Sequence, residues 1–141
     1  MTTELIVNLS VDEVSKILHE IRTFSCTAGK AWYEFGKRWL YLHDNKSHKV
    51  MQFQTFDEFI RSYTHYSRSW VYFTMAVARV FGRVIETSTQ VDIEFSRLRD
   101  ALPLIETDTD AEVWFNRAKS LPLEGWRDEL REAQGKLPTD E

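Results

Sequence analysis

The sequence predicts an all-α protein, a compact helical domain with a helix-turn-helix-like pair near its centre. Apolar residues recur at the spacing of a helical face along most of the chain. Three of these segments begin with Ser or Thr followed three residues later by Glu, the pattern of a capping box. The 141 residues are 43% hydrophobic and 13% aromatic, enough for one buried core.

The first helix is predicted from residue 11 to about 42. Ser10 and Glu13 form the first capping box, and apolar residues then keep helical spacing as far as Trp39. We expect an interruption of this helix near Cys26–Gly29.

Residues 39–54, WLYLHDNKSHKVMQFQ, are compatible with two structures. One is the end of the helix followed by a loop, which we favour. The other is a small β-hairpin, because Asn45 and Ser47 are turn formers flanked by strand-like residues.

A pair of helices is predicted within residues 56–81. Thr55 and Glu58 form the second capping box, and Phe56, Phe59, Ile60 and Tyr63 then lie on one helical face. Thr64–Tyr66 make a turn, and Ser67 caps a helix that we expect from Arg68 to Phe81, with Gly82 stopping or kinking it.

Three further helices are expected towards the C-terminus. The first covers roughly residues 90–102 and ends near Pro103, and the second opens at a capping box of Thr109 and Glu112 and ends about Ser120. The last has Pro122 in its first turn and ends at Gly135 and Pro138. We therefore divide the chain into a helical domain, 1–85, and an acidic helical segment, 86–141, either packed on it or a separate subdomain.

The net charge is −4, but the charges are segregated along the chain. Residues 59–85 hold four arginines and no acid, a local charge of +4, whereas residues 86–113 hold eight acids and two arginines, a local charge of −6. One interpretation is a face that binds an anion. The other is a buried helix pair that simply contains few acids.

The basic segment supplies the candidate DNA-binding residues. In a helix-turn-helix, the first turns of the second helix contact the bases, which makes Arg68, Ser69 and Tyr72 the main candidates, with Ser67 beside them. Arginine binds guanine through two hydrogen bonds, and the free amides at the helix N-terminus suit a phosphate. The arginines predicted to neutralise backbone phosphates are Arg61, Arg79 and Arg83. The alternative is a core helix, since the segment is apolar around most of its circumference.

The run GKRWLYL…FQTFDEFIRSYTHYSRSWVYFTMAVARVF resembles the helix-turn-helix region of phage, plasmid and bacterial regulators related to the ParB/KorB group. The matching residues are Gly36-Lys37, Thr55–Phe59 and Ser67–Ser69, and the resemblance covers about residues 28–82. It implies a DNA-reading helix pair. The turn glycine of that group is His65 here, which we expect in a left-handed conformation. Val71 replaces an alanine, which we expect to alter how the helices cross.

A weaker resemblance to a C-terminal helix pair of phage-type regulators covers AEVWFNRAKSLPLEGWRDELREAQG and implies association with a partner or with a second copy. Its apolar residues are interpreted mainly as core: Trp114, Phe115, Leu121, Leu123 and Trp126.

No enzyme, cofactor or metal site is predicted. His43, His48 and Cys26 lack the spacing of a metal site, and GKAWYEFGK lacks the order of a phosphate-binding loop. The carboxylates of Asp108, Asp110 and Glu112 are interpreted as charges that favour a helix N-terminus.

No segment reaches the roughly 18 apolar residues of a membrane span, and MTTELIVNLSVDE lacks the basic region of a signal peptide. With a single cysteine, we expect a cytoplasmic protein.

Three functions follow from these observations. The first is a regulator that binds double-stranded DNA, with a homodimer as its possible form. The second is a protein-interaction factor that modulates host transcription machinery, such as RNA polymerase, without reading DNA. The third is a structural α-domain that oligomerises through its aromatic helices.

Overall fold

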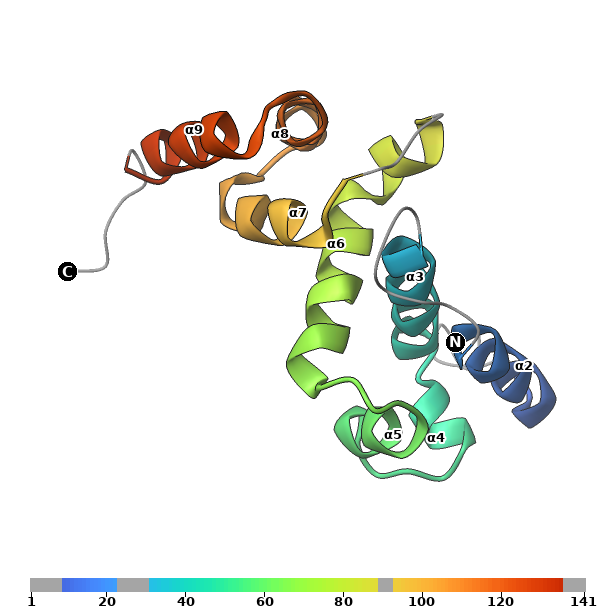
Figure 1. Cartoon of the computed structure of the whole chain (residues 1–141). Coiled ribbons are helices and arrows are strands. Elements are labelled where there is room, and N and C mark those ends of the chain that lie inside the picture. Colours follow the sequence, from blue (N-terminus) through green and yellow to red (C-terminus); the bar gives the residue numbers. More distant parts are fainter. Residues whose placement is uncertain (1–8, 23–30, 89–92, 136–141) are drawn as a thin grey trace.

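The computed structural model describes residues 9–22, 31–88 and 93–135 (Figure 1). In these ranges the regular structure is entirely helical, with eight α-helices and one 3-10 helix, which confirms the all-α class. The elements in chain order are α2 (Val11–Arg22), α3 (Ala31–Asp44), α4 (Ser47–Val50), α5 (Phe56–Tyr63), α6 (Arg68–Thr87), α7 (Phe95–Ala101), η1 (Leu102–Leu104), α8 (Asp108–Ser120) and α9 (Leu123–Gly135).

Helix α6 runs through the middle of the molecule, with α3 beside it and α2 on the far side of α3, α4 and α5 at its N-terminal end and α7–α9 towards the other end (Figure 1). Helices α3 and α6 approach closely at Gly36, where a Cβ atom would lie 2.3 Å from the carbonyl oxygen of Thr74. Only glycine allows this backbone contact. The rings of Trp32, Phe35 and Trp39 are buried on the same face of α3.

The predicted helix over 11–42 consists of two helices, α2 and α3, and the interruption expected near Cys26–Gly29 lies outside the described residues. The first capping box is confirmed, because Ser10 Oγ accepts a hydrogen bond from Glu13 N and Glu13 Oε1 accepts one from Ser10 N, each 3.1 Å long. Val14, Leu18 and Ile21 of α2 are buried in the core.

The β-hairpin considered for residues 39–54 is wrong and the favoured helix is confirmed, but the segment expected to be a loop contains the short helix α4 (Ser47–Val50). Trp39 and Leu42 are fully buried, so this part of the chain stays helical to bury them both on one face. Lys46 adopts a left-handed conformation, with φ 53°, which turns the chain into the short helix α4.

Helix α5 begins at Phe56, and Thr55 caps it by accepting a hydrogen bond from Glu58 N at 3.1 Å. Phe56, Phe59 and Ile60 are buried as predicted. Helix α6 does not stop at Gly82 but continues to Thr87, because Ile85 is also fully buried and extends the apolar face by another turn.

The C-terminal helices pack on α6 through aromatic contacts. Phe95 of α7 lies 4.5 Å from the Trp70 ring and 5.6 Å from the Trp32 ring, and Trp32 Nε1 donates to Ile93 O. Trp114 and Trp126 are buried edge to face, which joins α8 to α9. Phe115 is buried too, whereas Leu123 is 47% exposed.

The capping box predicted at Thr109 and Glu112 is wrong by two residues. Thr107 is the N-cap, its hydroxyl accepts from Asp110 N, and the Asp110 carboxylate accepts from Thr107 N. Both threonines are followed by an acid three residues later, and the earlier one starts α8 in the register that buries Ala111 and Trp114.

We expect Gly36→Ala to lower the free energy of unfolding by about 2–3 kcal/mol, because the new methyl group would force α3 away from Thr74. Chemical denaturation measures this change. Gly125→Ala is the matched control, since its Cβ would lie 3.7 Å from the nearest atom, Leu121 Cδ2, and alanine favours a helix by up to about 1 kcal/mol. Equal stabilities for the two variants would contradict the close approach.

Candidate nucleic-acid interface

The corner between α5 and α6 is formed by residues 64–67. Thr64 is extended after the last residue of α5, and its hydroxyl accepts from Tyr66 N at 3.3 Å. Among the described residues other than glycine, only Lys46 and Gln52 have positive φ, so the left-handed conformation expected for His65 is wrong. The corner is built without a residue in that conformation because Thr64 and Ser67 are both extended.

Ser67 caps α6, its hydroxyl accepting from Trp70 N at 3.1 Å. The backbone N–H groups of Arg68 and Ser69 belong to the first turn of this helix and therefore have no acceptor within it. Ser67, Arg68 and Ser69 are all exposed. Three of the predicted residues thus lie together around an open helix N-terminus, a place where an anion is favoured.

Asp57 of α5 binds two of the predicted residues. Arg68 Nε lies 2.7 Å from Asp57 Oδ2, and the Tyr72 hydroxyl donates to Asp57 Oδ1 at 2.9 Å. The Arg68 guanidinium also lies over the Tyr72 ring, 5.2 Å from its centroid. Partial burial, followed by the hydrogen bond and negative charge of Asp57, raises the pKa of Tyr72.

Arg79 is paired with a carboxylate of α3. Arg79 Nη2 lies 2.9 Å from Asp44 Oδ1, and the side chains are 57% and 46% exposed. Partial burial alone would raise the pKa of Asp44, but its hydrogen bonds with His43 and Arg79 and their charges lower it below the ordinary value.

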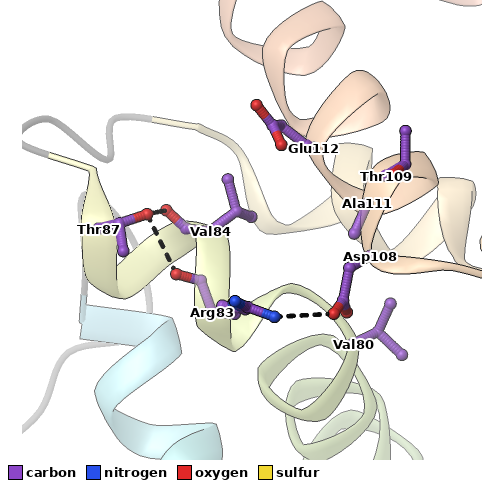
Figure 2. Close-up of a pocket in the computed structure, with 8 residues that line it drawn as sticks. All are labelled: Val80, Arg83, Val84, Thr87, Asp108, Thr109, Ala111 and Glu112. Carbon is purple, nitrogen blue, oxygen red and sulfur yellow. Dashed lines mark hydrogen bonds and ion pairs between the residues drawn. The ribbon is translucent and has the colours of Figure 1, made fainter.

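Arg83 lies on a different part of the surface. It reaches across to Asp108 at the start of α8, 3.0 Å away, at the edge of a hollow of about 350 Å³ (Figure 2). Thr87 and Glu112 line the same hollow. At 1.5 Å per residue, Arg83 is about 22 Å along α6 from Arg68, so the two arginines cannot contact one phosphate.

The predicted residues therefore form two groups. Arg61, Ser67, Arg68, Ser69 and Tyr72 lie at the corner, whereas Arg79 and Arg83 lie farther along α6 beside carboxylates of α3 and α8. Arg61 is exposed, and no ion pair joins it to any acid in the described residues.

Sequence reasoning missed three residues at this corner: Arg22, His65 and Tyr66. The Tyr66 ring stacks between His65, 4.4 Å away, and Trp70, 6.0 Å away. Arg22 is the last residue of α2, and only the packing of α2 on the core brings it near Arg61 and His65. No local sequence pattern could therefore have predicted its place in this site.

Within the described ranges, no group of three or more histidine, cysteine or acidic side chains is placed to hold a metal ion. None of the helices in those ranges has both the length and the apolar character that a bilayer span requires. No protein-family model, curated protein or solved structure matches the chain. The likeness to the ParB/KorB group therefore depends only on the residues quoted for it.

We expect Asp57→Asn to lower the pKa of Tyr72 towards its ordinary value of about 10, because the asparagine amide carries no charge to oppose phenolate formation. An NMR titration of the Tyr72 ring measures this shift. Asp128→Asn is the control, since Asp128 pairs with Arg131 on α9. A Tyr72 titration that is the same in both variants would contradict the contact.

Proposed function

We propose that the protein binds double-stranded DNA as a regulator, with α5 and α6 acting as a helix-turn-helix. The observation that supports this most strongly is the corner itself. A turn of a few residues joins the two helices, and the second helix starts with exposed polar residues. In Figure 1, α5 is viewed along its axis while α6 is viewed from the side, so the two helices run in clearly different directions. Helix pairs of this form place the start of the second helix in the major groove.

At this corner each candidate residue has a distinct role in the proposal. Arg68 and Ser69 contact base edges, because they lie in the first turn of α6 and are exposed. The free amides of the same turn donate hydrogen bonds to a backbone phosphate, and Arg61 binds a neighbouring phosphate. Tyr72 orients Arg68 by packing under its guanidinium and sharing Asp57 with it.

The acidic partners limit the interface to the corner. Arg79 and Arg83 are each already paired with a carboxylate, so each adds less to the free energy of DNA binding than Arg61 does. We therefore assign Arg79 a weak, sequence-independent contribution and place Arg83 outside the contact surface. The net charge of −4 also agrees with a small interface rather than a broad basic face.

A second function, a protein-interaction factor for host transcription machinery, is favoured by the surface of α8 and α9. Val113 is 40% and Leu123 47% exposed, and the carboxylates of Glu112 and Glu124 are exposed as well. Exposed apolar side chains, each next in sequence to an exposed acid, suit a basic protein partner. A chain that binds purified RNA polymerase but no duplex at low salt would favour this function over DNA binding.

We expect Arg68→Ala to reduce discrimination at one base pair by about 1–3 kcal/mol, because a bidentate contact to guanine is lost. Selection from a random duplex pool identifies the preferred site, and fluorescence anisotropy then measures both variants on matched and mismatched duplexes. Arg131→Ala is the control, since Arg131 is also an exposed arginine paired with an aspartate. Retained base preference in Arg68→Ala would exclude this role for Arg68.

Asp57→Asn is expected to tighten DNA binding by a factor of about two to five. The variant removes a carboxylate that competes with DNA for Arg68, and an exposed pair of this kind contributes about 0.2–1 kcal/mol. Asp128→Asn removes the same charge far along the chain and serves as the control. Weaker binding by Asp57→Asn would show instead that Arg68 needs this carboxylate in order to act.

A further inference from the structure

A hollow of about 550 Å³ lies between the end of α2, α3 and the end of α5. We call it the α2–α5 hollow. Arg22, Arg61 and His65 line it together with the aromatic rings of Phe35, Tyr63 and Tyr66. Its volume is within the range of about 300–1,000 Å³ that is typical of ligand sites.

The charge of the α2–α5 hollow distinguishes it from its neighbours. The hollow between α6 and α8 includes Asp108 and Glu112, and the one between α2 and α3 includes Glu20 and Asp44. Among its described lining residues, the α2–α5 hollow has two arginines and a histidine but no acid. Of the described residues that line this hollow, all are positively charged or neutral.

Neither arginine of the hollow is neutralised by an ion pair within the described residues. Arg61 is exposed, and Arg22 is held over the Tyr63 ring, 5.8 Å from its centroid. This contrasts with Arg68, Arg79 and Arg83, each of which has a carboxylate within 3.0 Å. Phe35, Tyr63 and Tyr66 form the aromatic part of the lining beside the two arginines.

The α2–α5 hollow is continuous with the corner that carries the proposed DNA contacts. A smaller hollow of about 240 Å³ shares Arg61, Thr64, His65 and Tyr66 with it and extends to Ser67 and to Arg68 with its partner Asp57. Cations thus follow one another from Arg22 through Arg61 to Arg68. A nucleic-acid strand carries a phosphate at each nucleotide, so a row of cations fits it better than it fits a single small anion.

We propose that the α2–α5 hollow is a phosphate-binding site, and that in the complex it holds a backbone phosphate next to the one at the N-terminus of α6. This inference extends the proposed function and depends on it for the source of the phosphate. The hollow adds affinity without sequence preference, because arginine contacts to phosphate carry no base information.

The test compares the salt dependence of binding to a short random-sequence duplex. Each lost phosphate contact reduces the slope of log K against log salt by about 0.9, so Arg22→Gln and Arg61→Gln should each reduce it by that amount. Arg127→Gln should leave it unchanged, since Arg127 is an exposed arginine of α9 that is distant in sequence from the hollow. Thermal unfolding checks that the variants fold, and the exposure of Arg22 and Arg61 favours this.

The outcomes separate this inference from the proposed function. If the wild-type chain binds duplex and Arg22→Gln keeps the slope of Arg127→Gln, the proposed phosphate site in the hollow is overturned while DNA binding stands, because the proposed function alone already assigns a phosphate to Arg61. If the chain binds no duplex, the proposed function fails. Titration with inorganic phosphate then shows whether the α2–α5 hollow binds phosphate on its own. Phosphate-dependent shifts of the Tyr63 and His65 ring NMR signals that disappear in the double variant support a site for free phosphate, and their absence in the wild-type chain overturns it.

Discussion

The backbone contact between α3 and α6 at Gly36 determines most of the structure. Because a Cβ atom at this position would lie 2.3 Å from Thr74 O, the two helices can pack this closely only through a glycine. The tryptophans of α3 pack against α7 and α5, Trp32 on Phe95 and Trp39 on Phe56 and Phe59, and the polar end of α3 lies at the surface of α6. Asp44 therefore meets Arg79, and Tyr33 and Lys37 both bond Glu86. One apolar contact thus decides which charges meet.

In the folded chain, most arginines of the acid-free segment are paired with an acid from another helix. Along the chain, residues 59–85 hold four arginines and no acid, but α3, α5 and α8 each bring an aspartate to one of these arginines. Arg61 is the exception within the described residues. Local charge is therefore a poor measure of where an anion binds, and the unpaired cations of the folded chain are a better one.

The sequence predicts those features that depend on neighbouring residues. The caps at Ser10, Thr55 and Ser67 were predictable because a hydroxyl and the amide three residues on are fixed by local geometry. Gly82 was misleading because the buried Ile85 outweighs the cost of a glycine inside a helix. The partners of Arg68 and Arg83 were not predictable, since Asp57 and Asp108 are 11 and 25 residues away in sequence.

On the proposed interface, the two kinds of arginine have different consequences for recognition. Arg68 is held by Asp57 and by the Tyr72 ring. It therefore leaves Asp57 only for an acceptor that offers an equivalent hydrogen bond in an equivalent geometry. A guanine edge meets that requirement, whereas a wrong base leaves Arg68 with Asp57 and contributes nothing. Among the described residues, Arg22 and Arg61 have no such competitor, and in the proposal they bind any phosphate. On this proposal, selectivity arises from the paired arginine and affinity from the unpaired ones.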